Sequence, residues 1–269
     1  MDYMKENYRE LNPQEIKDIS LQILLDVSEF CKKNNITYFL ACGTLLGAIR
    51  HSGFIPWDDD IDIMMPRPDY KRFLEEYNSS QYDIYKPERG LLCYSKVYDK
   101  RTIKYEPGTD YDKNEPYGVD IDVFPLDGIV NDEKIVNRMY KFECFLEMLL
   151  RLSNQPIFMR KNPIKAINRI VPRIIGSKNI VKMIEKHAQK YDYDKSEYVV
   201  RMKRSLNGFT GALKKEVYEK SYKEFEGHLF CVPKGYDEWL TAFFGDYMTL
   251  PPIEKRIPSH PTECYIIEE

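Results

Sequence analysis

Four aspartates within five positions constrain this chain more than any other stretch. The segment "IPWDDDIDIMM" contains them and leads directly into apolar residues typical of a buried strand; they are Asp58, Asp59, Asp60 and Asp62. Carboxylates this close repel one another by a few kcal/mol per pair at an effective dielectric constant of about 20. We therefore expect this segment to hold a cation.

The order of side chains along a strand indicates how a cation would be held. Residues i and i+2 point to the same face of a strand, so a strand here directs Asp60 and Asp62 to one face while Ile61 and Ile63 enter the core. An unpaired buried carboxylate is very costly. Oxygen ligands in an open arrangement suit Mg²⁺ or Mn²⁺, with water and substrate phosphates as the remaining ligands.

A second segment, "GVDIDVFPLDG", repeats this pattern. Asp120 and Asp122 share one face of the expected strand, opposite Ile121 and Val123. Two such strands side by side would form a metal site of three carboxylates, two from the first strand and one from the second. The alternative is that these aspartates are solvated residues at strand ends and in loops, as a single aspartate usually is. Two acidic strands in one chain favour the metal site.

Helical and strand periodicities divide the chain into elements. Asn12 and Pro13 mark the cap and first residue of an amphipathic helix, and a glycine turn leads into a short helix after residue 42. We expect strands at 37–42, 61–65, 92–98, 102–105 and 119–124, helices at 69–77, 132–153, 161–172 and 177–190, and a last strand-and-helix segment at 197–250. This pattern predicts an α+β fold with a mixed β-sheet core flanked by helices and an additional helical region.

Composition excludes several classes of protein. The chain has 269 residues and a net charge of −3, so no strongly basic face suggests a nucleic-acid partner. Its six cysteines are widely spaced and form no C-x-x-C pair, which favours buried free thiols in a reducing compartment. Neither a signal peptide nor an 18-residue apolar stretch is evident. We therefore expect a cytoplasmic protein.

The order of these motifs resembles the polymerase-β-type nucleotidyltransferase superfamily. The string "FLACGTLLGAIRHSGFIPWDDDIDIMM", followed by "IDVFPLDG" and "FFGDYMTLPPIEKR", is similar to the LicD family of phosphocholine transferases, relatives of fukutin and fukutin-related protein. The similarity runs from about residue 38 to residue 260. It implies a nucleotidyltransferase-like catalytic core at 1–130, a helical insertion or subdomain at 131–195, and a C-terminal strand-helix segment at 196–269 that completes the catalytic domain.

The resemblance assigns catalytic roles to the aspartates. Asp60 and Asp62 would be the metal pair for Mg²⁺ or Mn²⁺, and Asp122 would be the third carboxylate, either the general base or a ligand of a second metal ion. Asp120 departs from the family pattern, in which a bulky residue stands at this position, and its role is left open.

The resemblance also implies residues that bind the substrate. Gly43 and Thr44 would form a turn that presents backbone N–H groups to a phosphate, and Arg50 would bind the donor pyrophosphate. Trp57 would stack on a base or contact a quaternary ammonium, although a place in the core is an equal alternative. Lys96 lies on an expected strand near the site.

The implied reaction is transfer of phosphocholine from CDP-choline to a hydroxyl of a cell-surface glycan, such as a teichoic acid, lipopolysaccharide or capsule precursor, with release of CMP. Four alternatives stay open. Transfer of another CDP-linked alditol phosphate would use the same residues. A D-x-D metal-dependent glycosyltransferase needs neither the Gly-Thr turn nor the second acidic strand. An aspartyl-phosphate phosphatase or a non-catalytic binding protein fits the motifs less well.

Residues 155–190 carry nine lysines or arginines and a single acid, although the whole chain is acidic. Apolar residues recur there at helical spacing, at positions 164, 167, 171 and 174, and Pro172 and Gly176 are expected to break the helix. Such a helix can lie at an anionic membrane surface, where a lipid-linked acceptor would be found. The alternative is a core-packing helix whose solvent face is basic.

Overall fold

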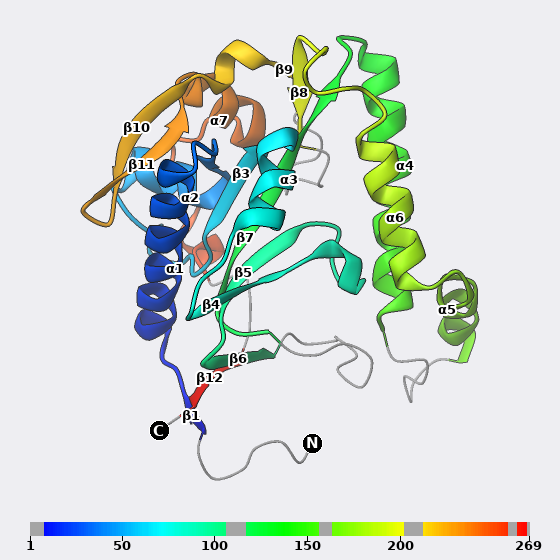
Figure 1. Cartoon of the computed structure of the whole chain (residues 1–269), viewed down its shortest axis with the longest axis horizontal. Helices are drawn as coiled ribbons and strands as arrows, with labels where there is room; N and C mark the ends of the chain where they lie inside the picture. Colours follow the sequence, from blue (N-terminus) through cyan, green and yellow to red (C-terminus); the bar gives the residue numbers. More distant parts are fainter. Residues whose placement is uncertain (1–7, 106–116, 156–162, 202–211, 258–262, 268–269) are drawn as a thin grey trace.

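A mixed sheet of seven strands lies at the centre of the computed structural model, which describes residues 8–105, 117–155, 163–201, 212–257 and 263–267 (Figure 1). Only β3 and β7 pair in parallel, while the other neighbours are antiparallel. The order along the sheet begins with β2 (Phe39–Leu40), β3 (Asp62–Pro66), β7 (Asp120–Ile129), β5 (Ser95–Asp99) and β4 (Tyr82–Tyr85), and the far end of β7 adds β8 (Tyr198–Val200) and β9 (Leu213–Lys214). The α+β prediction is confirmed.

The strand β7 organises this sheet because it is longer than its neighbours. Its pairing with β5 stops at Val123, and its pairing with β8 starts at Asp127. Pro125 falls between these two points, where its missing N–H costs no ladder hydrogen bond. Between these two points, no described strand pairs with this edge of β7. The β7 residues there form one wall of a pocket.

Three helices lie close to the sheet: α1 (Pro13–Lys33), α2 (Cys42–Arg50) and α3 (Arg67–Glu76). Asn12 caps α1 as expected, because its side chain accepts hydrogen bonds from the backbone of Gln14 and Glu15 while Glu15 reaches back to the Asn12 N–H. The helix α7 (Tyr236–Phe244) follows the hairpin of β10 (Lys220–Phe225) and β11 (His228–Pro233). We did not predict this hairpin, whose solvent-facing strand is largely polar.

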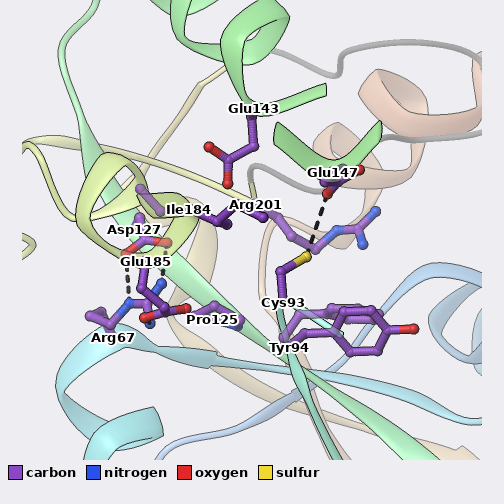
Figure 2. A pocket seen from close by; sticks show the side chains of 12 residues that line it. Arg67, Cys93, Tyr94, Pro125, Asp127, Glu143, Glu147, Ile184, Glu185 and Arg201 are labelled. Atoms are coloured by element: carbon purple, nitrogen blue, oxygen red, sulfur yellow. Dashed lines mark hydrogen bonds and ion pairs between the residues drawn. The ribbon is translucent and has the colours of Figure 1, made fainter. Parts of the chain in front are cut away.

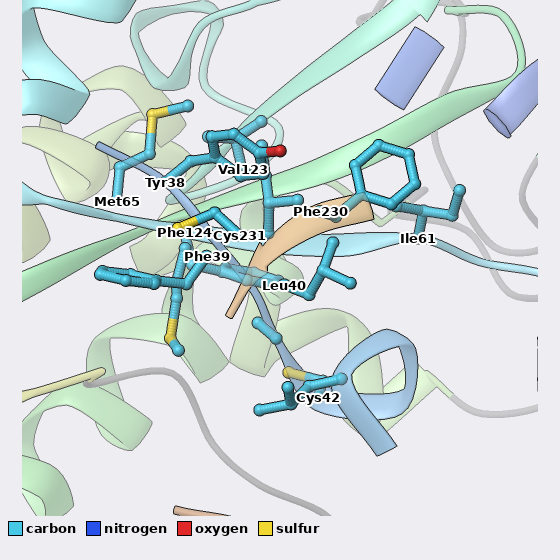
Figure 3. Packing of buried hydrophobic residues seen from close by; sticks show 14 of the residues in the cluster. Tyr38, Phe39, Leu40, Cys42, Ile61, Met65, Val123, Phe124, Phe230 and Cys231 are labelled. Atoms are coloured by element: carbon cyan, nitrogen blue, oxygen red, sulfur yellow. The ribbon is translucent and has the colours of Figure 1, made fainter. Parts of the chain in front are cut away.

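The main core fills the space between the sheet, these helices and the hairpin. Figure 3 shows how Phe39 and Leu40 of β2 pack with Val123 and Phe124 of β7 and with Phe230 of β11. All of them are at most 2% exposed. Burial of several large side chains from strands distant in sequence fixes the register of β2, β3 and β7.

The three helices that follow β7 lie to one side of the sheet in Figure 1. They are α4 (Glu133–Ser153), α5 (Pro163–Ile175) and α6 (Ser177–Ala188), and they contact one another. Pro172 lies inside α5, so the expected break occurs only at Gly176, whose φ is +82°. The division of the chain into three domains stays a prediction.

A second sheet joins the two ends of the described chain. It orders β1 (Tyr8–Glu10), β12 (Glu263–Ile267) and β6 (Thr102–Tyr105) in antiparallel pairs. All six cysteines are free, as predicted, but Cys93 and Cys144 are only half-buried, so the prediction of buried thiols is wrong for these two. Within the described residues, no helix is long and apolar enough to cross a bilayer.

Candidate active site

Parallel pairing of β3 and β7 places Asp62 directly beside Asp122. The Asp62 N–H donates a hydrogen bond of 2.8 Å to Oγ1 of Thr44, and the Asp122 N–H donates one of 2.8 Å to the carbonyl of Ile61. The prediction that the two acidic strands are neighbours is confirmed. Asp62 is 8% exposed, so the cluster lies at the edge of the core and not in bulk solvent.

Asp58 and Asp60 belong to the loop before β3, which begins only at Asp62. The expected alternation along a strand therefore does not apply to Asp60, and the loop brings it to the cluster instead. Burial, together with the nearby Asp60, Asp62 and Asp59, raises the pKa of Asp58 to about 8. Sequence reasoning named Asp60 and Asp62 and missed Asp58 as a site residue, although Asp58 belongs to the same run of neighbouring carboxylates.

Gly43 and Thr44 lie in the first turn of α2, whose N-cap is Ala41. A Cβ atom on Gly43 would lie 2.4 Å from Oδ2 of Asp58, so only glycine admits this carboxylate. The Thr44 hydroxyl holds the start of β3 through its bond to Asp62. The expected glycine turn is thus the start of a helix, where exposed N–H groups and the helix dipole favour a phosphate.

Lys96 of β5 stands opposite Asp122 of β7 and contacts two aspartates. Its Nζ lies 2.6 Å from Oδ1 of Asp122 and 2.5 Å from Oδ2 of Asp120, and Nζ of Lys104 lies 2.7 Å from Oδ1 of Asp120. Burial alone would lower the pKa of Lys96, but Asp120 and Asp122 outweigh it and hold that pKa well above its ordinary value. Lys96 is therefore charged, and Asp120 positions it.

Arg50 and Arg256 form a cationic group near Trp57. Nη1 of Arg50 donates a hydrogen bond of 2.7 Å to the carbonyl of Tyr247, and the guanidinium of Arg256 lies 5.5 Å from the centre of a Trp57 ring. Burial lowers the pKa of Arg50, and the charge of Arg256 lowers it further. Two neighbouring guanidinium groups suit an anion. Arg256 was missed as a site residue, although it lies in the quoted "PPIEKR" string.

Comparison with known proteins identifies the family of this chain. A family model described as "LicD/FKTN/FKRP, nucleotidyltransferase domain" matches residues 35–163. The chain is 34% identical to the lipopolysaccharide cholinephosphotransferase LicD of Haemophilus influenzae over 96% of this chain and 100% of that relative. The chain belongs to the LicD family. An uncharacterized protein of Rickettsia typhi is 30% identical over 59% of this chain and 47% of its own length.

The oxygen-rich cluster of this LicD-family chain fits a divalent cation in an open site. In the described part of the chain, no three histidine, cysteine or acidic side chains stand close enough to enclose a metal by themselves. Mg²⁺ commonly takes only one or two carboxylates and completes its shell with water and substrate phosphates. Burial and repulsion from neighbouring aspartates raise the pKa of Asp58, and a bound cation would offset both.

The structure therefore brings together most of the residues singled out from the LicD-like motifs. Asp62, Asp122 and Lys96 meet on adjacent strands, and Asp60 approaches through its loop contact with Asp58. Thr44 contacts the same cluster through Asp62. The catalytic and binding roles of these residues stay predictions.

Proposed function

We propose that this LicD-family protein transfers phosphocholine from CDP-choline to a hydroxyl of a glycan and releases CMP. The observation that carries the proposal is the 34% identity along the full length of a relative named lipopolysaccharide cholinephosphotransferase. The geometry supports the reaction class, because carboxylates and a buried lysine converge at one place on the sheet. Phosphoryl transfer depends mainly on positioning and on neutralisation of charge.

In this proposal Asp60 and Asp62 hold Mg²⁺ or Mn²⁺. When bound, the ion would neutralise charge on the pyrophosphate and on the departing CMP. The N–H groups at the start of α2, near Gly43, face one phosphate of the donor, and Arg50 with Arg256 bind its pyrophosphate. Trp57 lies beside Arg256 and offers a ring on which a base can stack.

Asp122 and Lys96 act on the reacting atoms in this proposal. The acceptor oxygen attacks the phosphorus that carries choline, a new P–O bond forms, and the P–O bond to CMP breaks. Asp122 accepts the proton of the attacking hydroxyl. Lys96 is held charged between two aspartates and neutralises the equatorial phosphate oxygens as the bond forms.

A donor panel tests the proposal. Purified protein is incubated with a glycan acceptor and CDP-choline, CDP-ribitol, CDP-glycerol or a UDP-sugar, and release of the nucleotide is measured. We expect release of CMP from CDP-choline. If only another CDP-alditol is turned over, the protein transfers that alditol phosphate and not phosphocholine. If only a UDP-sugar is turned over, the protein is a glycosyltransferase.

The acceptor in this proposal is still attached to a lipid, and α5 meets the inner face of an anionic membrane. Ile170, Val171 and Ile174 of α5 support this, because they are 50%, 61% and 79% exposed. Arg169 is one of the nine basic residues expected in segment 155–190, but it is only 4% exposed, so the prediction of a basic solvent face is wrong for this residue. The fold turns Arg169 inward. Lys161 and the side chain of Lys165 lie outside the described part.

Vesicle binding tests the membrane contact. We expect the protein to sediment with vesicles of anionic lipid at low salt, and Val171→Asp with Ile174→Asp to abolish this while turnover of a small soluble acceptor continues. Lys178→Glu with Lys182→Glu, both exposed on α6, should weaken binding in the same way. If the wild-type protein does not sediment with these vesicles at low salt, the proposed membrane contact is wrong.

A further inference from the structure

A second acidic site lies beside the open edge of β7, between the sheet and the helices α4 and α6 (Figure 2). We call it the helix-side pocket. Its lining includes Tyr94, Phe124, Asp127, Glu143, Glu147 and Arg201. The empty space within it is about 350 Å³, its open mouth included. None of these residues has a role in the reaction proposed above.

Glu143 is the most unusual group in this pocket. It is 3% exposed, Figure 2 shows its carboxylate pointing into the pocket, and its Oε2 atom has no hydrogen-bond partner. Nε2 of His187 is 4.0 Å away, but it hydrogen-bonds the Met139 carbonyl, and burial lowers the pKa of His187. A buried carboxyl oxygen without a partner destabilises the fold, so a ligand that binds it would explain its presence.

The charges around Glu143 favour a cation as that ligand. Burial, together with the nearby charges of Glu147 and Asp127, raises the pKa of Glu143 to about 9. Asp127 is already held by Arg67 through two hydrogen bonds of 2.6 and 2.7 Å. The lining contains four acidic side chains and two arginines. A cation bound beside Glu143 would offset both the burial and the repulsion from neighbouring acids, and would favour its ionised form.

Aromatic rings form the wall of the pocket nearest the candidate active site. The Tyr94 and Phe124 rings contact each other with 4.7 Å between their centres. Each ring already attracts a cation of the protein, since Arg201 lies 4.8 Å from the centre of Phe124 and Lys96 lies 5.8 Å from that of Tyr94. Ring faces beside carboxylates are the usual environment for a quaternary ammonium, which carries no N–H to donate.

Lys96 joins this wall to the acidic cluster on the sheet. Its Nζ is 2.6 Å from Asp122 and 5.8 Å from the centre of the Tyr94 ring. A phosphate held beside Asp122 and Lys96 would therefore have the pocket as its neighbour. In phosphocholine only a short ethylene bridge separates phosphate from ammonium, so both groups can be held at once.

A metal ion is the less suitable occupant. Two arginines line the same pocket, and the rings of Tyr94 and Phe124 offer a metal ion no ligand from that wall. We propose that the helix-side pocket receives the quaternary ammonium of the donor's choline, with Glu143 and Glu147 supplying negative charge and Tyr94 supplying a ring face. This inference rests on the proposed function and names the part of the chain that selects choline.

An uncharged isostere of choline isolates the contribution of charge. CDP-choline is compared with CDP-3,3-dimethylbutanol, in which carbon replaces nitrogen and the shape is kept. For the wild-type protein we expect a preference of about 30-fold in kcat/KM for CDP-choline, expressed mainly in KM, as for a desolvated cation–π and carboxylate contact. Glu143→Gln and Tyr94→Leu should each reduce this preference to about 3-fold or less.

Glu133→Gln is the matched control, because it makes the same change on an exposed residue of the same helix. It should keep the wild-type preference, and thermal unfolding should show that every variant is folded. Equal use of the two donors by the wild-type protein would overturn the inference. So would an unchanged preference in Glu143→Gln. In both cases CDP-choline is turned over, so the proposed function stands.

A failure of the proposed function is recognised separately. If CDP-choline is not turned over at all, calorimetric titration of the full chain with choline chloride and with 3,3-dimethylbutanol replaces the kinetic test. Binding of choline alone, lost in Glu143→Gln and kept in Glu133→Gln, would support the pocket without the reaction. Absence of choline binding would then overturn the inference as well.

Discussion

Lys96 and Asp122 form an ion pair across adjacent antiparallel strands, with 2.6 Å between Nζ and Oδ1. Asp120 holds the same ammonium from two residues earlier on β7, so the lysine is fixed between two carboxylates. This arrangement supplies a permanent positive charge at the centre of an acidic cluster. It also assigns Asp120 a positioning role that strand alternation alone could not distinguish from metal binding.

Replacing Lys96 tests this relationship. Lys96→Met leaves Asp122 without this cation and Asp120 with Lys104 alone, so we expect kcat to fall by about 100-fold or more. Breaking a buried ion pair should also cost about 3–5 kcal/mol of unfolding free energy. Lys104→Met is the control, since it keeps the contact between Lys96 and Asp122. Equal losses of kcat in the two variants would contradict a direct role for Lys96.

The metal site is tested by binding as well as by activity. Asp62→Asn and Asp60→Asn should be folded and inactive, and excess chelator should inactivate the wild-type protein. Mg²⁺ at 100 times its dissociation constant should stabilise the wild-type fold by about 2.7 kcal/mol, and Asp62→Asn should lose most of this. Full activity in excess chelator would end the metal prediction.

A substitution at Gly43 tests how closely the helix α2 approaches the acidic loop. A Cβ atom there would lie 2.4 Å from Oδ2 of Asp58, so we expect Gly43→Ala to destabilise the fold by about 1–3 kcal/mol. The double variant with Asp58→Ala removes the obstructing carboxylate and should recover much of this loss. Chemical denaturation of the four proteins in the cycle measures the coupling. Additive effects would show that the two residues do not meet.

Glu143 predicts a pH dependence of stability. Its pKa is raised from 4.5 to about 9 in the folded chain, so between these values the unfolded chain releases a proton that the folded chain keeps. Stability from this group is therefore present below pH 4.5 and is lost as pH rises toward 9, by at most about 1.4 kcal/mol per pH unit.

Glu143→Gln should remove this loss, so its stability relative to wild type should increase from pH 5 to pH 8.5. The neighbouring groups are present in both proteins and cancel in the difference; they are Glu147, Asp127, Glu185, His187, Arg67 and Arg201. Urea unfolding at the two pH values measures the difference. A constant difference would show that Glu143 is ionised in the folded chain throughout.

Local patterns in the sequence predicted much of the fold. Asn12 and Pro13 predicted the start of α1, because a helix cap depends only on residues within one turn. The apolar alternation around Asp62 and Asp122 predicted two buried strands, and these are neighbours in the sheet. The hairpin β10–β11 escaped prediction, since apolar and polar residues alternate only weakly along β10.

By itself, the sequence determined that carboxylates gather at the start of a buried strand and need positive charge, because repulsion between neighbouring acids does not depend on the fold. Only the tertiary structure decided which charges supply it. Lys96 reaches Asp122 because β5 pairs with β7 in one register, and Glu143 faces Tyr94 because α4 packs over an edge that β5 leaves open. Such contacts join residues that lie far apart in the chain. They depend on how whole strands pair and how helices pack, and no local sequence pattern encodes this.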